Sequence, residues 1–435
     1  MTVRIAHISD THLGARPSRG VKHNVWGVEM RTRLLENDFY DRFAELFDRI
    51  AALDPPADLV VHSGDLYDSP WENNPSQPPV VAQETAIRVL KGFIEKTGIP
   101  VLILEGNHGL YRSLKVSLLD SLKLAVPGLD VVTQVDLTRA FSNEEPLMYS
   151  YPEVDVFCFP FMEESVLEST GLMSDFNDWI SSCQTPTPKK VSIGVAHGMT
   201  IDKSLHSGIF ELDLDYIALG HDHSQHRHAK NAWYAGSPER WRFDETRAEK
   251  GFLVVDVEHL KQPRVTPIHL EFSRPVYNEK IAIKPDDDEP TLIEKVEQWL
   301  TEKGLKKPWE PTTSARIRLT FEGQAKRVSG FELSMAMEAL RTRILAQESD
   351  YNVSQLVWNI RQPDIEHSPS AYPEIDSEYL IEDPEEDFRA YLETLDVDER
   401  FDETMLTKIA VRALKFSVSR SDEKLSLENY TEGEE

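Results

Sequence analysis

The stretch VRIAHISDTH (residues 3–12) decides the fold class, because an apolar run of strand length ends directly in Asp10 and His12. Val and Ile recur in the run, and such a short apolar segment predicts a buried β-strand. The two polar side chains then stand at the carboxyl end of the strand. In open α/β sheets this is the end at which sites assemble.

Further apolar runs along the chain end in the same way, in a carboxylate, an amide or an imidazole. Because the carboxyl ends of parallel strands meet at one edge of a sheet, we expect the polar residues after them to gather with Asp10 and His12. The runs are DLVVHS (58–63), PVLILE (100–105), VSIGVA (191–196) and DYIALG (215–220), and the polar residues are Asp65, Asn107, His108, His197, His221 and His223.

Helical patterns separate the first of these strands. Residues 36–53 carry apolar side chains at helix spacing, and residues 82–95 form a second amphipathic pattern. Near-continuous apolar strands separated by helices predict an α/β fold, a layered αββα sheet core with both faces covered. The polar segments 11–33 and 67–80, rich in Gly or Pro, are expected to be loops over a site.

The sequence changes character near residue 270, and this change predicts further domains. Residues 1–270 would form the core, and residues 271–361 follow a β-α-β-α-β order typical of a smaller α+β domain. Residues 362–435 open with prolines among carboxylates, as a linker does. They then carry two short amphipathic patterns, which predict C-terminal helices at 387–395 and 403–416.

Composition limits the class of protein. The chain has 435 residues, of which 40% are hydrophobic, so a sizeable core is expected. The formal net charge of −28 argues against general DNA affinity, but residues 362–435 contain 22 acidic and 7 basic residues and hold over half of the excess. The two cysteines, Cys158 and Cys183, suggest a reducing, cytoplasmic setting. No apolar stretch has the roughly 18 residues of a membrane span.

The residue types after the strands point to bound metal. Carboxylates and imidazoles with one carboxamide and no thiolate suit divalent ions such as manganese, iron or zinc. Taken alone, the pair Asp10 and His12 is more typical of polar side chains on the protein surface than of a metal site. Gly64-Asp65 alone is typical of a turn. Taken together, the residues would hold two ions, with Asp65 as the bridging carboxylate, and two such ions form a clamp for phosphoryl transfer. His7 and His62, inside strands, are expected to be packed or hydrogen-bonded.

The order of these residues resembles the calcineurin-like metallophosphoesterase signature: D-x-H, G-D-x-x-D, G-N-H, a lone H, and G-H-x-H. Four stretches look like one branch of that family, the SbcD and meiotic recombination eleven nucleases of DNA double-strand break repair. They are SDTHLG (9–14), GDLYD (64–68), LDYIALGHDH (214–223) and YAGSPERWRFDE (234–245). The motifs span about the first 250 residues.

The resemblance implies roles for these residues. One metal would be held by Asp10, His12, Asp65 and His223, and the other by Asp65, Asn107, His197 and His221. His108 would be the general acid or a donor to the phosphate. The family cleaves DNA phosphodiesters with manganese preferred, and iron, zinc or magnesium remain alternatives. Residues 271–361 would be the capping domain, the C-terminal helices would bind an SbcC-type coiled-coil ABC ATPase, and a homodimer is expected.

Two positions bear on the role of His108. Asp68 stands where archaeal and eukaryotic members often have His and bacterial members have Asp, and it is expected near the substrate. Gly109 replaces the usual acid after G-N-H, which looks like the partner that orients the catalytic histidine. His108 would then be held by another group, such as Asp10 or a backbone carbonyl, or would be less effective.

DNA binding by an acidic chain requires local basic surface. The candidates flank the predicted site, and tryptophans in or near the same loops could stack on bases. Solvated charges and local packing are the alternatives for these groups. The candidates are Arg16, Arg19, Lys22, Arg31, Arg33, Arg240, Arg242 and Arg247, with Trp26, Trp71 and Trp241.

Three functions remain open from the sequence. The first is a DNA exonuclease or endonuclease working with an ATPase. The second is a phosphodiesterase or phosphatase for small molecules, which the long segment after the catalytic part disfavours. The third is a non-catalytic scaffold, for which Gly109 is the supporting feature.

Overall fold

The computed structural model describes residues 1–15, 26–68, 78–109, 117–183, 190–270, 274–346 and 348–361. Residues 1–363 form one compact unit. The predicted helices at 387–395 and 403–416, and with them the third predicted domain, lie outside the described residues. No helix in the part of the chain that the structure describes is long and apolar enough to span a membrane.

The first sheet is mixed and has the strand order β12-β11-β1-β2-β3-β4. Strands β1 to β4 run parallel, whereas β11 pairs antiparallel with β1 and β12 pairs antiparallel with β11. The strands are β1 (Thr2–Ile8), β2 (Leu59–His62), β3 (Val101–Leu104), β4 (Leu129–Val132), β11 (Gly251–Glu258) and β12 (Arg264–His269).

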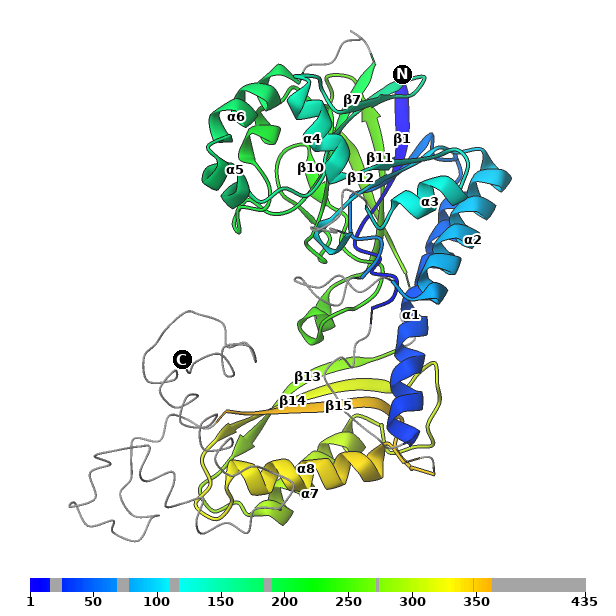
Figure 1. The fold of residues 1–435 in the computed structure, drawn as a ribbon. Coiled ribbons are helices and arrows are strands. Elements are labelled where there is room, and N and C mark those ends of the chain that lie inside the picture. Colours follow the sequence, from blue (N-terminus) through cyan, green and yellow to red (C-terminus); the bar gives the residue numbers. More distant parts are fainter. Residues whose placement is uncertain are drawn as a thin grey trace, which may run out of the picture. The chain divides into compact units, whose positions relative to one another are not determined.

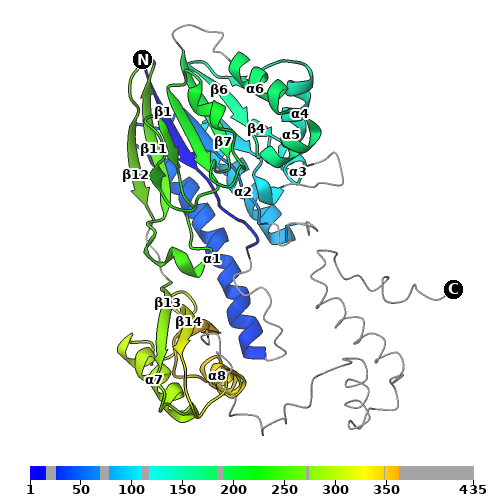
Figure 2. The same cartoon turned by 90° about the vertical axis from the view of Figure 1, so that its left-hand side faces the viewer.

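The second sheet has the order β5-β6-β7-β8-β10-β9, with β6, β7, β8 and β10 parallel. Figure 2 shows it beside the first sheet. The strands are β5 (Met148–Ser150), β6 (Val154–Phe159), β7 (Val191–His197), β8 (Tyr216–Gly220), β9 (His226–Arg227) and β10 (Ala232–Tyr234).

Helices cover the outer face of each sheet (Figure 1). The helices of the first sheet are α1 (Trp26–Ala51), α2 (Val80–Thr97) and α3 (Asp120–Ala125). Those of the second are α4 (Gln134–Ser142), α5 (Glu164–Thr170) and α6 (Met173–Ser182), and short 3-10 helices occupy η1 (Asn107–Gly109), η2 (Ser207–Glu211) and η3 (Phe243–Arg247).

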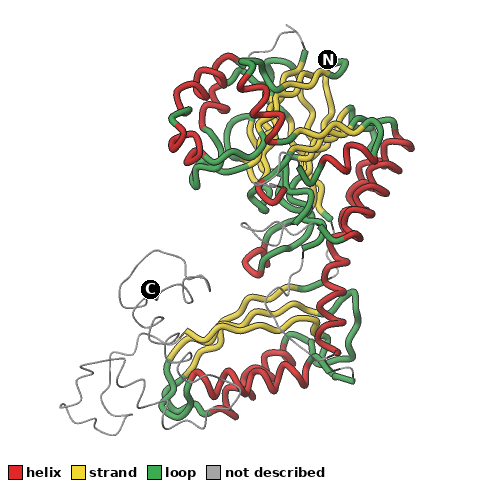
Figure 3. The backbone as a smooth tube through the Cα atoms, viewed as in Figure 1, coloured by secondary structure: helices red, strands yellow, loops and turns green. Residues whose placement is uncertain are grey.

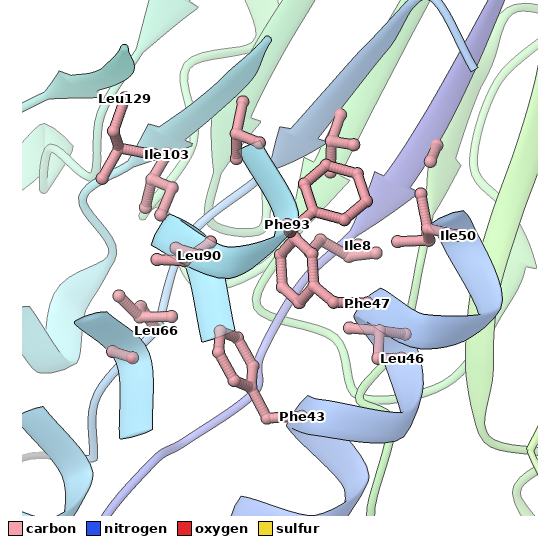
Figure 4. Close-up of a cluster of buried hydrophobic side chains, with 14 of the residues drawn as sticks. Ile8, Phe43, Leu46, Phe47, Ile50, Leu66, Leu90, Phe93, Ile103 and Leu129 are labelled. Atoms are coloured by element: carbon pink, nitrogen blue, oxygen red, sulfur yellow. The ribbon is translucent and has the colours of Figure 1, made fainter. Parts of the chain in front are cut away.

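Three buried clusters hold these layers together. Figure 4 shows the first, where Phe43 and Phe47 of α1 and Phe93 of α2 pack on Ile8 and Ile103 of the first sheet. A second cluster fills the space between the two sheets, with Ile5 and Val61 from one and Val156 and Ile193 from the other among its members. A third lies between the second sheet and its helices. The predicted αββα layering is therefore confirmed.

The start of α1 differs from the sequence prediction. Residues 26–33 were expected in a loop, but the helix begins at Trp26. Near this end of the helix Arg31, only 1% exposed, donates to the carbonyl oxygens of Ile344 (3.1 Å) and Val353 (2.9 Å), more than 300 residues away. Because distant contacts stabilise this end of the helix, the helix start could not be predicted from the local sequence pattern.

A separate three-stranded parallel sheet, β13-β14-β15, follows the core. Two helices cover one of its faces (Figure 3), and the four elements before β15 alternate strand and helix as expected. The helix starts are capped: Asp288 accepts from the Thr291 amide, and Ser329 forms a capping box with Glu332. The elements are β13 (Val276–Ile283), α7 (Glu289–Glu302), β14 (Ala315–Gly323), α8 (Gly330–Ile344) and β15 (Val353–Arg361).

Candidate metal centre

The predicted site residues meet where strands of both sheets end. Asp10, Asp65 and His221 adopt positive φ angles of 51°, 55° and 100°, as does His12 at 45°. Non-glycine residues seldom adopt this left-handed conformation, which is unfavourable and is found mainly at functional sites. Four strained residues in one place indicate that the fold holds these side chains against their local preference.

Glycines allow the strand ends to approach one another. A Cβ atom on Gly64 would collide with the ring of His197, and one on Gly106 would collide with the carboxylate of Asp65. The chain at these turns therefore passes closer to the site side chains than any larger residue would permit.

The first ligand group joins Asp10, His12 and His223. The Nε2 atoms of His12 and His223 lie 3.0 Å apart. The Oδ1 atom of Asp10 is 4.0 Å from the first of them and 3.8 Å from the second. These three ligand atoms come from the turns after β1 and β8.

The second group joins Asp65, His197 and His221, with Asn107 between the two imidazoles. Asn107 Oδ1 lies 3.0 Å from His197 Nε2 and 3.1 Å from His221 Nδ1. His197 Nε2 is also 3.3 Å from Asp65 Oδ2. The structure thus brings together all seven residues that the sequence singled out as ligands.

Contacts on the far side of three of the ligand imidazoles indicate which nitrogen faces the site. His197 Nδ1 donates to the carbonyl oxygen of Ser63 at 2.8 Å, and His223 Nδ1 donates to Glu245 Oε1 at 2.9 Å. The Nε2 atom of His221 faces Asp202 Oδ2 at 3.3 Å. The remaining nitrogen of each neutral ring therefore turns a lone pair into the site.

These nitrogen lone pairs face other hydrogen-bond acceptors across the site. His197 Nε2 faces the oxygens of Asp65 and Asn107, and His12 Nε2 faces His223 Nε2. Facing acceptors require a cation or a proton between them. Imidazoles whose far nitrogen is anchored to an oxygen, converging with carboxylates, are the arrangement found around protein-bound divalent metals. The donor set therefore fits divalent ions.

The pKa shifts follow from the same crowding. Burial lowers the pKa of His197, but the charge of Asp65 outweighs burial and raises it. Burial raises the pKa of Asp65, yet His197, His108 and His12 bring it well below its usual range. Without bound cations, protons on the imidazoles would offset the charge of the carboxylates, and bound cations would displace those protons.

His108 is held by Asp68. The Nδ1 atom of His108 lies 2.9 Å from Asp68 Oδ1, and His12 Nδ1 lies 3.6 Å from the same oxygen. Burial lowers the pKa of His108, but the charges of Asp65, Asp68 and Asp10 outweigh it and raise the pKa to about 9. Asp68, which is 1% exposed, faces the two imidazoles. Its expected place near the substrate stays a prediction. The sequence analysis suggested Asp10 or a backbone carbonyl as the partner of His108. In the structure Asp68 lies next to His108 Nδ1.

Gly109 faces Glu105. A Cβ atom there would lie 3.1 Å from the Cγ atom of Glu105. Glu105 is buried, accepts from the Gln134 amide at 2.7 Å, and pairs with the Ser117 hydroxyl. Burial raises the pKa of Glu105 to about 7. The space beside Gly109 is therefore occupied by an existing acid.

We expect Gly109→Asp to destabilise the protein and not to raise any metal-dependent activity of the site. A second carboxylate would crowd Glu105 in a buried site, and overpacking alone costs about 1–3 kcal/mol. Urea unfolding of Gly109→Asp and Gly109→Ala would separate charge from volume, because the alanine adds only the methyl group. A gain of activity in Gly109→Asp would show that the carboxylate missing from this position limits the wild type.

Several contacts around the site were not predicted. Trp241 stacks on His12, with ring centroids 5.0 Å apart and planes 4° apart, and Glu245 anchors His223. Lys250, fully buried, donates to Glu245 at 2.6 Å. The motif SPERWRFDE suggested roles only for its arginines and its tryptophan. Three acids in this motif, followed by a lysine at position 250, were the available signal.

The basic residues expected to bind DNA differ in burial and in whether the structure describes them. Arg16, Arg19, Lys22 and Trp71 lie outside the described residues, as do the side chains of Trp26 and Arg33. The expectation for Arg31 is wrong, because its side chain is buried against Ile344 and Val353. Arg242 is exposed, with its guanidinium 4.7 Å from the centroid of Trp241, while Arg240 is partly buried and Arg247 is exposed.

The prediction for the two strand histidines is confirmed. His7 lies 2.8 Å from the Tyr216 hydroxyl and 2.9 Å from that of Ser63. His62 Nε2 lies 3.0 Å from the Thr11 hydroxyl. Both rings are fully buried behind the ligand groups.

Comparison with known proteins agrees with this geometry. The chain is 27% identical over 260 residues to the DNA double-strand break repair protein Mre11 of Saccharolobus solfataricus, an alignment that covers 58% of each chain. It is 25% identical over 317 residues to Mre11 of Thermoplasma acidophilum, covering 69% of this chain and 74% of that protein. It is 25% identical over 281 residues to the SbcD component of the SbcCD nuclease of Staphylococcus epidermidis, covering 59% and 67%.

The chain thus spans about three fifths of the length of the first of these relatives. The sequence profile of the calcineurin-like phosphoesterases matches residues 3–225, which is just over half of the chain. These residues include all seven ligand candidates and His108. The chain belongs to the calcineurin-like phosphoesterase family.

Proposed function

We propose that the chain is a manganese-dependent DNA phosphodiesterase, an exonuclease or endonuclease that processes DNA ends in double-strand break repair. The observation that carries this proposal is the convergence of ligand atoms that face one another as acceptors, in a chain whose relatives are named as double-strand break repair proteins and as part of a nuclease. Imidazoles anchored on their far side that converge with carboxylates in this way are the arrangement found around protein-bound divalent metals.

The two groups would hold two ions. Asp10, His12, Asp65 and His223 would bind one, and Asp65, Asn107, His197 and His221 the other. Asp65 is the shared ligand because its carboxylate lies among atoms of both groups. When bound, the ions would activate water as the nucleophile and offset the charge on the phosphate oxygens. Nitrogen and oxygen ligands without thiolate are compatible with manganese.

The chain's own residues would position the substrate and supply the proton. The His108 amide donates to Asp65 Oδ1 at 2.9 Å, so the turn that carries the imidazole is tied to the shared ligand. Asp68 holds Nδ1, which leaves Nε2 as the nitrogen able to donate to a phosphate oxygen or a leaving group. We assign Asp68 the orienting role that the family resemblance suggests for an acid after G-N-H.

The proposed protein partners are those suggested by the names of the relatives and by the family resemblance. The SbcCD nuclease is named as an assembly of more than one component, so an SbcC-type coiled-coil ABC ATPase is the proposed partner, with the acidic C-terminal segment as its docking region. A homodimer is proposed from the same family resemblance. Arg242, exposed next to Trp241, is the described basic side chain best placed to meet a DNA phosphate.

We expect the purified chain to degrade linear or hairpin DNA in manganese, alone or with the ATPase, and to stop in excess chelator. Linear, closed-circular and hairpin DNA would separate end-dependent from internal cleavage. Cyclic nucleotides and simple phosphate esters serve as the matched small substrates. No cleavage of any DNA under these conditions would reject the proposal, and fast hydrolysis of cyclic nucleotides with no response to DNA would favour the small-molecule alternative.

A further inference from the structure

Residues 240–245, which we call the clamp loop, cover one half of the site. The loop carries Trp241, whose ring lies flat on His12 at a centroid distance of 5.0 Å. The same ring meets His108 edge-on at 5.5 Å and 84°. An aromatic ring stacked on a ligand imidazole limits the rotation of that imidazole, so the position of the loop sets the plane of His12.

Glu245 fastens the clamp loop to a second ligand. Its carboxylate accepts from His223 Nδ1 at 2.9 Å and from the backbone amides of Trp241 and Arg242 at 3.2 and 3.1 Å. Lys250 donates at 2.6 Å to Oε2, the oxygen that also accepts from the Trp241 amide. The carboxylate is thus shared between the loop and His223.

The outer side of the clamp loop is held by Arg316, on the central strand β14 of the three-stranded sheet. Its Nη1 atom donates to the carbonyl oxygen of Arg240 at 2.8 Å and its Nη2 atom to that of Trp241 at 3.2 Å. Its Nε atom donates to Gln355 Oε1 at 3.0 Å. Arg316 is 3% exposed, and loss of its guanidinium would leave the partly buried carbonyl groups of Arg240 and Trp241 without these donors.

These contacts of the clamp loop orient side chains of the first ligand group rather than those of the second. The clamp loop touches His12 and His223, which belong to the first group. The second group is oriented from elsewhere, with His197 held by the Ser63 carbonyl and His221 facing Asp202. A disturbance of the loop would therefore reach the first group and leave the anchors of the second in place.

We propose that Arg316 is a positioning residue for the first metal site, Asp10, His12 and His223, acting through the clamp loop. The inference rests on the proposed two-metal function and deepens it, because it makes the small β-α-β-α-β domain a structural part of the metal centre. The guanidinium fixes the carbonyls of Arg240 and Trp241, the loop fixes Trp241 and Glu245, and these two fix the rings of His12 and His223.

A general role in joining the small domain to the core is the alternative. Other arginines already do this: Arg31 of α1 donates to the carbonyls of Ile344 and Val353, and Arg274 pairs with Asp38 of α1 at 2.6 Å. Because these contacts remain when Arg316 is replaced, the small domain should stay attached. An effect confined to one metal site would then separate positioning from general cohesion.

The test is calorimetric titration of manganese into chelator-stripped, full-length protein. We expect two ions to bind the wild type, and Arg316→Met to weaken one of them about 10-fold, at the lower end of the range of about 10–100-fold for partners of metal ligands, while the other is unchanged. Glu245→Gln, which alters the direct anchor of His223, should weaken the same ion. Arg316→Lys keeps the charge without the fork of donors and should restore part of the affinity.

Arg318→Met is the matched control. Arg318 lies two residues along the same strand, with its guanidinium 5.4 Å from the centroid of Phe243, where that of Arg316 is 5.1 Å away. Its Nε atom donates to Asn278 Oδ1 at 3.0 Å, away from the clamp loop carbonyls. This variant should bind both ions as the wild type does.

Three outcomes would overturn the inference. Unchanged binding of both ions by Arg316→Met would reject it while leaving the proposed function intact. Equal weakening of both ions, accompanied by a lower unfolding temperature, would assign Arg316 to general cohesion. A wild type that binds fewer than two ions would reject the two-metal proposal itself, and this inference with it.

Discussion

Replacement of Asp65 by Asn is expected to lower the rate of DNA cleavage at least about 1000-fold, equivalent to about 4 kcal/mol in transition-state stabilisation. Asp65 is the carboxylate whose oxygens lie among atoms of both ligand groups, with His197 Nε2 at 3.3 Å. A neutral amide cannot offset the charge of two divalent ions, so at least one ion should be lost. Steady-state cleavage rates and manganese stoichiometry would measure the two effects separately.

The matched control for this variant is Asp222→Asn. Asp222 stands between two of the proposed ligands, but its carboxylate accepts from the Ser224 amide at 2.8 Å and lies 3.9 Å from His226. Loss of its charge should leave metal binding and cleavage within a few-fold of the wild type. An Asp65→Asn protein that keeps both ions and most of its activity would contradict the role of the shared ligand.

The layered core could be predicted from the sequence because its signals are local. Each strand that ends in a site residue, such as Leu59–His62 before Asp65, is a short apolar run, and the period of the following helices is visible in ten to twenty residues. The ligand candidates could be predicted for the same reason. A residue type at a strand end needs no knowledge of the partner strand to be recognised.

The contacts that orient the ligands could not be predicted, because they join distant parts of the chain. His223 and Glu245 are 22 residues apart, and Arg316 and Arg240 are 76 apart. Arg31 shows the same limit: a basic residue beside a predicted loop suggested DNA binding, but its carbonyl partners lie 313 and 322 residues away. The sequence shows residue types, whereas the burial and the partners of a side chain depend on which distant segments the fold brings together.

Gly109 illustrates how the structure changes an argument from sequence. Its lack of a carboxylate suggested that His108 had lost its partner. Asp68 lies 2.9 Å from His108 Nδ1, so a carboxylate from a different turn stands where that partner was expected. The two turns follow β2 and β3, which are adjacent in the sheet, and this adjacency is what brings the pair together.

Replacement of His108 by Gln is expected to lower kcat about 10²–10⁴-fold, the range for loss of a general acid. Manganese affinity should change little, because the imidazole is proposed to donate a proton and not to bind metal. Single-turnover cleavage at saturating manganese, with calorimetric titration of the same protein, would check both points. A large loss of metal affinity would instead make His108 a ligand, as its closeness to His12 and Asp65 would permit.

Asp68→Asn tests how His108 is positioned. The variant keeps the volume of the side chain but removes the charge beside Nδ1, so we expect a smaller loss of about 10–100-fold in kcat. Asp68 raises the pKa of His108, and an acid with a lower pKa loses its proton at lower pH. The alkaline limb of the kcat profile should therefore move to lower pH in Asp68→Asn. An unchanged profile with an unchanged kcat would mean that another group orients the imidazole, and it would leave the carboxylate only the role of a buried counter-charge to His12.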